Sequence, residues 1–193
     1  MTSDSLIKAV PTSPTVPLNC ARCPIRELTV CRPFRGPALD VVQNFKLGDR
    51  ILAAGSHLFL PGQRITELYN LLDGWVALYS IFASGRRQIV DFALPGAFLG
   101  YQPNLDAPML IGAECLTDVA VCRFPRRPFH DLALRHTALS LQLAKINSHS
   151  MIRIHAKLAN IGARSALECT AHLILEILMR LRGDEPRSLR GVF

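Results

Sequence analysis

The pattern of apolar residues, glycine and proline changes after Pro128, and this change constrains the fold more than any other feature of the sequence. Between Phe45 and about Pro125 the chain consists of short apolar or alternating runs broken by glycine. Runs of this length with regular turn signals favour a closed antiparallel β architecture such as a jelly roll. Residues 129–160 contain neither glycine nor proline, and apolar residues recur there at spacings of three and four. This pattern predicts one long helix, so we expect an α+β fold.

The strands should lie in the apolar runs that the glycines separate. Asp73-Gly74 and Ser84-Gly85 are dipeptides typical of tight hairpin turns. The expected strands lie within 51–55, 57–62, 68–74, 75–82, 87–92 and 119–122.

The long helix presents a narrow apolar stripe, which suits pairing with a second copy of the same helix. Packing of the stripe against the helix's own β domain is the alternative. Gly162 can end this helix, and Ser165 then caps a second helix over 166–182 with Glu168 in its first turn. The residues expected at a homodimer interface are Leu139, Leu143, Ile146, Ile154 and Leu158.

Three cysteines near the N-terminus, Cys20, Cys23 and Cys31, follow the pattern C-x2-C-x7-C. Thiolates at such spacing can bind one metal or iron–sulfur centre, and a complete site needs a fourth ligand. Cys115 and Cys122 are the two candidates for that ligand. Such a centre would hold a mobile N-terminal arm against the rest of the protein. Loss of the centre would then be felt at a distance, as is expected of a sensor.

Composition narrows the class of protein further. The 193 residues fit one ordinary domain with appendages. No run of 18 or more apolar residues argues for a membrane span, and residues 1–19 lack the apolar core of a signal peptide. We therefore expect a cytoplasmic protein with reduced cysteines.

The net charge of +7 is compatible with nucleic-acid binding but is weak evidence for it, because much of the charge comes from dispersed arginines. The six histidines are scattered and no catalytic motif occurs, so we do not expect an enzyme.

Several segments in combination resemble the CRP/FNR family of bacterial transcription regulators. The resemblance implies a cyclic-nucleotide-binding-domain-like β jelly roll, the effector domain, over 37–128 and a dimerisation helix over 129–161. The start of a DNA-binding half would occupy 162–193, and a disordered tail with the cysteine arm would occupy 1–36. The segments are Leu60-Pro-Gly62, Leu68-Tyr69 with Gly74, Gly85-Arg-Arg-Gln-Ile-Val-Asp-Phe92, Leu94-Pro-Gly96-Ala-Phe-Leu-Gly100 and the stretch from Leu158 to Glu176.

Within this family, the oxygen-sensing FNR branch holds a [4Fe–4S] cluster with three N-terminal cysteines and one in the β domain. The resemblance assigns the cluster to Cys20, Cys23, Cys31 and Cys122 and leaves Cys115 as the reserve ligand. Zinc is the other metal that four thiolates would bind. Cys169 is expected to be a small residue on the buried side of the second helix.

Two departures from the family shape the functional expectation. Gly96-Ala97-Phe98 puts apolar residues where the family's ribose-binding glutamate stands, and no arginine or lysine occurs between Arg87 and Arg123. A bound phosphate would lack its charge partner, so we expect no cyclic nucleotide.

The family also reads DNA with a helix-turn-helix that follows the junction between the dimerisation helix and the DNA-binding half. Nothing after Arg182 supplies it, and the sequence does not distinguish a truncated chain from a natural sensor without a reader.

Two functions follow from these expectations. The first is the sensor and dimerisation part of an oxygen- or redox-responsive transcription regulator, whose full-length version would bind DNA as a symmetric dimer. The second is a non-DNA-binding interaction protein that pairs with full-length relatives through the helix, with or without a metal. The sequence does not tell oxygen from nitric oxide or another redox signal.

Overall fold

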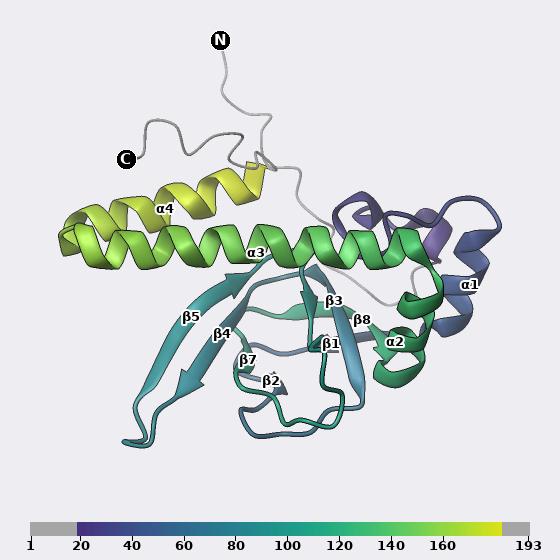
Figure 1. The fold of residues 1–193 in the computed structure, drawn as a ribbon, viewed down its shortest axis with the longest axis horizontal. Helices are drawn as coiled ribbons and strands as arrows, with labels where there is room; N and C mark the ends of the chain where they lie inside the picture. The colour runs from purple at the N-terminus through teal and green to yellow at the C-terminus, as the bar shows by residue number, and fades with distance from the viewer. Residues whose placement is uncertain (1–18, 183–193) are drawn as a thin grey trace, which may run out of the picture. The chain divides into compact units, whose positions relative to one another are not determined.

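The computed structural model describes residues 19–182 of the chain. The chain divides into two compact units, residues 1–142 and residues 143–193, and each is described by itself. Helix α3, Thr137–Ala163, begins in the first unit and continues in the second (Figure 1). Among residues 19–182, none of the helices combines the length and apolarity that crossing a lipid bilayer requires.

The first unit is built around two antiparallel sheets of four strands each, with strand orders β1-β8-β3-β6 and β2-β7-β4-β5 (Figure 1). This is the predicted jelly-roll sandwich. Strands β6 and β7 were not among the expected runs, because one is only two residues long and the other begins with glycine. The strands are β1 Gly48–Leu52, β2 His57–Phe59, β3 Glu67–Asp73, β4 Val76–Ile81, β5 Arg87–Ala93, β6 Phe98–Leu99, β7 Gly112–Cys115 and β8 Val119–Pro125.

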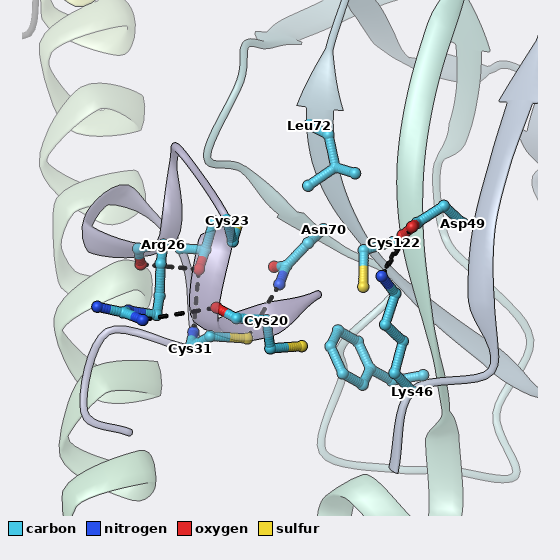
Figure 2. A pocket seen from close by; sticks show the side chains of 11 residues that line it. Cys20, Cys23, Arg26, Cys31, Lys46, Asp49, Asn70, Leu72 and Cys122 are labelled. Atoms are coloured by element: carbon cyan, nitrogen blue, oxygen red, sulfur yellow. Dashed lines mark hydrogen bonds and ion pairs between the residues drawn. The ribbon is translucent and has the colours of Figure 1, made fainter. Parts of the chain in front are cut away.

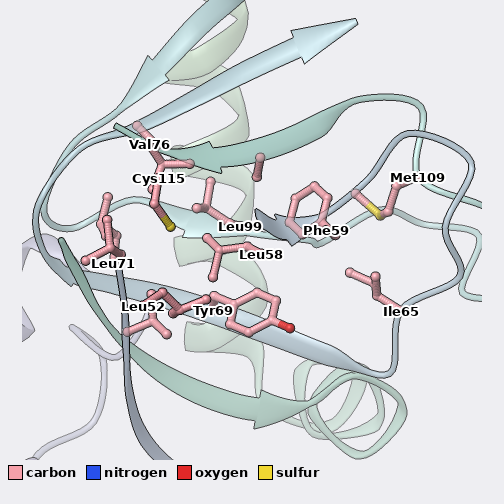
Figure 3. Packing of buried hydrophobic residues seen from close by; sticks show 14 residues of the cluster. Leu52, Leu58, Phe59, Ile65, Tyr69, Leu71, Val76, Leu99, Met109 and Cys115 are labelled. Atoms are coloured by element: carbon pink, nitrogen blue, oxygen red, sulfur yellow. The ribbon is translucent and has the colours of Figure 1, made fainter. Parts of the chain in front are cut away.

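The space between the two sheets is filled by apolar side chains (Figure 3). Alternate residues of each strand point inward, as the period of a strand requires. Leu71 and Val121 from one sheet and Val76 and Ala113 from the other have no exposed surface. The same cluster contains Phe59, Tyr69, Leu99, Met109 and Cys115.

The two hairpin-turn predictions had different outcomes. Ser84-Gly85 does join the paired strands β4 and β5, and the Gly85 N–H donates to the carbonyl of Phe82 over 2.8 Å. Asp73-Gly74 is wrong as a hairpin, because β3 and β4 belong to different sheets and the turn carries the chain from one to the other. Gly74 is needed there for its φ of 85° and because a Cβ would stand 2.3 Å from the carbonyl oxygen of Asp118.

The prediction of one helix over 129–160 was wrong, because the chain forms α2, Arg126–Arg135, and then α3. His136 between them is extended, with φ −121° and ψ 93°. Ala133 and Leu139 are both buried. Residues six apart in a continuous helix point about 120° away from each other. The break lets both side chains bury, so tertiary packing ends α2 without a glycine or proline.

The cysteine arm is folded and packed in the structure, whereas we expected a mobile segment. Cys20–Arg22 and Arg26–Leu28 form the short 3-10 turns η1 and η2, and helix α1, Ala38–Phe45, follows. Val30 and Phe34 are 0% and 1% exposed. Apolar burial therefore anchors the arm to the first unit. The expected disorder of the tail concerns residues outside the described part of the chain, except Asn19, whose side chain caps η1.

In the second unit, α3 ends at Ala163 and α4, Ala166–Arg182, follows as predicted. Ser165 and Glu168 form a capping box: the Ser165 N–H donates to Glu168 Oε2 over 2.8 Å, and the Glu168 N–H to Ser165 Oγ over 3.4 Å. Lys157 of α3 pairs with Glu176 of α4 at 3.7 Å. The expected approach to a DNA-reading module after Arg182 lies outside the described residues.

Candidate metal centre

A pocket in the first unit, between the cysteine arm and the outer face of the sheet that contains β3 and β8, brings four cysteines together (Figure 2). Cys20, Cys23 and Cys31 come from the arm, and Cys122 comes from β8. Cys20, Cys31 and Cys122 are buried, and Cys23 is half-buried. All six cysteines of the chain are free thiols in the structure.

The arm is shaped by local hydrogen bonds that place its three thiols. The Cys20 N–H donates to Gln43 Oε1 on α1 over 2.8 Å, and the Cys23 N–H donates to the Cys20 carbonyl over 3.4 Å. The Cys31 N–H donates to Thr29 Oγ1 over 3.1 Å. The backbones of Cys23 and Cys31 are therefore held within the arm, and that of Cys20 is held by α1.

The sheet contributes a row of polar residues across three adjacent strands. Asp49 on β1 and Asn70 on β3 are both register partners of Cys122 on β8. Side chains at paired positions point to the same face of a sheet. The row therefore faces the arm, and the side-chain amide of Asn70 donates from Nδ2 to Cys31 Sγ over 3.4 Å (Figure 2).

A buried ion pair completes the wall of the pocket. Lys46 Nζ lies 2.7 Å from the Asp49 carboxylate, and the two side chains are 3% and 15% exposed. The Lys46 ammonium is a positive charge beside the thiols. It lowers the pKa of Cys20 and Cys122, although burial is the larger influence and raises both above their usual value. Burial also raises the pKa of Cys31, to about 12.

The donor set of this pocket suits a thiophilic metal centre. Four sulfur donors are the ligand set of structural zinc and of iron–sulfur clusters. Within residues 19–182, no three side chains of His, Cys, Asp or Glu are grouped closely enough to hold one metal ion. In an iron–sulfur cube each cysteine binds a different iron, so its ligands need not converge on one point as zinc ligands do. The pocket chemistry is therefore compatible with a cluster.

The other two cysteines lie elsewhere. Cys115 is 1% exposed and belongs to the apolar cluster between the sheets (Figure 3). Cys169, on α4 in the second unit, is half-buried and contacts the carbonyl of Asn160 at the end of α3 over 3.5 Å. Neither residue lines the cysteine pocket.

Sequence reasoning missed Lys46, Asp49 and Asn70 as pocket residues. Asn70 left a signal, because it is the one polar residue within the run Leu68-Tyr-Asn-Leu-Leu72. Asparagine is depleted in strands, so its presence in a buried strand requires a local reason. Lys46 and Asp49 lie near the start of the β domain and carry no such signal.

Ala97 and Phe98, the residues that we expected to exclude a cyclic nucleotide, pack against other apolar and aromatic side chains. Phe98 contacts Phe129 of α2 at a ring-centroid distance of 5.0 Å, and Ala97 packs against the inter-sheet core. Arg126 is a buried cation that sequence reasoning did not single out, and it donates to the carbonyls of Ile65, Asn104 and Leu105. The absence of a bound nucleotide stays a prediction.

The stripe predicted at a dimer interface differs in exposure along α3. Leu139 is fully buried and Leu143 is 6% exposed, whereas Ile146 is half-buried. Ile154 and Leu158, in the second unit, are 50% and 62% exposed. The described chain itself therefore buries Leu139 and Leu143, whereas Ile154 and Leu158 have surface available to a partner. The interface stays a prediction.

Comparison with known proteins gives a consistent set of relatives. The Cyclic nucleotide-binding domain profile matches residues 49–136. The nitrogen fixation regulation protein FixK of Bradyrhizobium diazoefficiens is 32% identical over 168 residues, which cover 85% of this chain and 69% of that protein. The transcriptional activatory protein AadR of Rhodopseudomonas palustris is 29% identical, with 91% and 74% covered. The fumarate and nitrate reduction regulatory protein of Yersinia pestis is 26% identical, with 90% and 70% covered.

Solved structures support the fold. FixK2 from Bradyrhizobium japonicum superposes with a TM-score of 0.63 at 21% identity, over 68% of this chain and 66% of that one. The catabolite activator protein of Thermus thermophilus superposes with a TM-score of 0.54 at 19% identity, over 66% and 60%. The named sequence relatives are regulators and not enzymes, as the sequence predicts for this chain. From the match to FixK and the shared fold, this chain belongs to the CRP/FNR family of transcription regulators.

Proposed function

We propose that this chain is the sensor and dimerisation part of an oxygen- or redox-responsive regulator, and that Cys20, Cys23, Cys31 and Cys122 hold a [4Fe–4S] cluster. One observation carries the proposal. The three arm thiols and the thiol of β8 line the same pocket, although they come from opposite ends of the first unit's sequence. The other cysteine of the β domain, Cys115, points into the apolar core instead.

The chain's own residues divide the work of the site. When bound, the cluster would supply the group that reacts with oxygen. The four cysteines would hold it as thiolates, so all four thiols must lose their protons on loading. The Lys46 ammonium would offset part of the resulting negative charge.

A physical connection leads from the cysteine arm to the start of α3. Cys31 lies between Thr29 and Phe34, and both of these contact the helix region. The Thr29 carbonyl accepts a hydrogen bond of 3.1 Å from Gln142 Nε2 on α3. The Phe34 ring lies 4.9 Å from that of His136, at the break between α2 and α3. A change in the arm would therefore bias the position of the helix that we expect to dimerise.

The experiment that tests this function follows assembly under a change of gas. Protein loaded anaerobically with iron and sulfide should sediment as a homodimer. Exposure to air should bleach its absorption and shift the population towards monomer. An oligomeric state that is the same before and after bleaching would contradict a sensor that acts through the helix.

The second function is a pairing module that needs no metal. Ile154 and Leu158 are exposed in the second unit, and the burial of Val30 and Phe34 anchors the arm without any metal. Under this alternative, metal-free protein would form mixed dimers with a full-length relative as readily as loaded protein does. Mixing the two forms with a tagged relative and comparing the captured fraction distinguishes the functions.

A further inference from the structure

The side chain of Asn70 is buried in a place where folding alone does not require a polar group. Asn70 lies in the middle of β3 and is 2% exposed, and its neighbours Leu68 and Leu71 are fully buried. Its Nδ2 donates to Cys31 Sγ over 3.4 Å. Its Oδ1 is buried and makes no hydrogen bond within the described residues.

An amide in this position opposes stability. Leaving a buried acceptor without a partner costs about 1–3 kcal/mol, and a hydrogen bond to a neutral thiol is weak. An apolar residue of similar size would avoid that cost. The residue at this position therefore has a reason other than the stability of the sheet.

The position of Asn70 gives that reason, because the residue links the two sources of thiol. Its backbone is in register with Cys122 on β8, and its side chain reaches Cys31 on the arm. The Cys31 backbone N–H is held separately by Thr29. Asn70 therefore fixes the side chain of Cys31 (Figure 2), while Thr29 fixes its main chain.

We propose that Asn70 is a positioning residue of the cysteine centre, which orients the Cys31 thiolate beside Cys122 and donates an N–H to its sulfur when the centre is loaded. This inference rests on the proposed function for the identity of the cluster. An N–H directed at a ligand sulfur becomes a charge-assisted bond once the thiol is ionised. It stabilises the more negative state, so it raises the reduction potential and protects the sulfur.

The test compares Asn70→Leu, which replaces the amide by an apolar group with the same branching, with Asn70→Asp, which keeps the shape but replaces the amide N–H by a carboxyl oxygen. Asn44→Leu is the matched control, because it makes the same chemical change at an exposed position of α1. After anaerobic loading with iron and sulfide, both Asn70 variants should lose the cluster in air about tenfold faster than wild type. Their reduction potentials should be more negative, and Asn44→Leu should match wild type. Wild-type lifetime and potential in the Asn70 variants that fold would overturn the proposal.

Two further readouts separate this inference from the cluster assignment. In metal-free protein, the Asn70 side-chain amide resonances should shift on Cys31→Ala and stay in place on Cys169→Ala. Unshifted resonances would refute the contact. Should wild type take up no iron and sulfide, the cluster assignment fails, and zinc titrated against a chelator becomes the probe of the same thiols. Asn70→Leu should then weaken zinc binding about tenfold or more, and equal zinc affinity would overturn the role of Asn70.

Discussion

Both faces of the sheet β1-β8-β3-β6 carry buried side chains, but they are built from different chemistry. On β3, Leu71 points into the apolar core between the sheets, while Asn70 points out towards the cysteine arm. On β8, Val121 and Cys122 divide in the same way. The inner face is closed with apolar side chains, and the outer face holds thiols, an amide and an ion pair.

The difference between the two faces shows how buried residues that stabilise the fold can be told from buried residues that serve a site. Burying apolar groups stabilises a fold, whereas burying polar groups costs free energy unless each is paired. The inner face therefore contributes stability through apolar burial alone, whereas the outer face combines buried apolar residues such as Phe124 with polar groups. The outer face retains groups that a purely structural surface would replace, and that is the expected mark of a site.

The largest expected effect comes from substituting one cysteine of the outer-face pocket, Cys122, and comparing it with one cysteine of the apolar core, Cys115. Cys122→Ser should abolish iron and sulfide binding after anaerobic reconstitution, because three thiolates leave one corner of a cluster without a protein ligand. Cys115→Ala should keep both, since Cys115 lies in the apolar cluster. Cys169→Ser is a further control and should also keep them. Loss of the cluster in Cys115→Ala with retention in Cys122→Ser would reverse the assignment of the fourth ligand.

A pair of adjacent leucines compares the stability of the two faces. Leu71 is fully buried in the core, whereas Leu72 is 8% exposed and lines the pocket. Leu71→Ala should lower the free energy of unfolding by about 2–5 kcal/mol, because it leaves a cavity in close-packed surroundings. Leu72→Ala should cost less than half as much, since the pocket already leaves space beside it. Urea denaturation measures both, and equal losses would mean that the two faces contribute alike to stability.

A third prediction carries the comparison to the second unit, where apolar residues are exposed and not buried. Leu158→Glu should weaken the homodimer at least tenfold, about 1.4 kcal/mol, because it puts an unpaired charge at the expected interface. Leu134→Glu is the matched control, since Leu134 on α2 is 73% exposed and outside the stripe. Sedimentation with native far-UV circular dichroism is the measurement. Equal dimer strength in both variants would remove Leu158 from the interface.

The smallest effect belongs to an exposed polar pair, the capping box of α4. Hydrogen bonds from Ser165 hold the pKa of the Glu168 carboxyl below its usual value of 4.5. A lowered folded-state pKa contributes stability that is complete above the unfolded value and is lost as the pH falls through the folded value. The protection of amides at the start of α4, measured as the exchange rate relative to the intrinsic rate at the same pH, should therefore decrease below about pH 4.5. In Glu168→Gln this pH dependence should disappear, and its persistence would assign the effect to another group.

Sequence patterns predicted much of this architecture because the relevant forces are local. The capping box at Ser165 and Glu168 needs only residues three apart, and α4 has the predicted bounds. The Gly85 hairpin likewise depends on a short local turn, residues 82–86 between β4 and β5. The two-sheet sandwich follows from the period of the strands.

The features that sequence reasoning missed depend on contacts between distant segments. His136 breaks the helix because Ala133 and Leu139 must both bury, and nothing in the residues 129–160 signals this. Asp73-Gly74 has the composition of a hairpin but joins two sheets. For the site, spacing indicated the cysteine trio, whereas the contribution of Asp49 and Asn70 depends on strand register and that of Lys46 on its ion pair with Asp49.

The measurement that tests the central claim most directly is the iron and acid-labile sulfide content of the protein after anaerobic reconstitution, read together with its absorption spectrum. We predict about four iron and four sulfide per chain and a brown colour that fades in air. Colourless protein without bound iron and sulfide, or protein that takes up one zinc per chain instead, would contradict the iron–sulfur sensor.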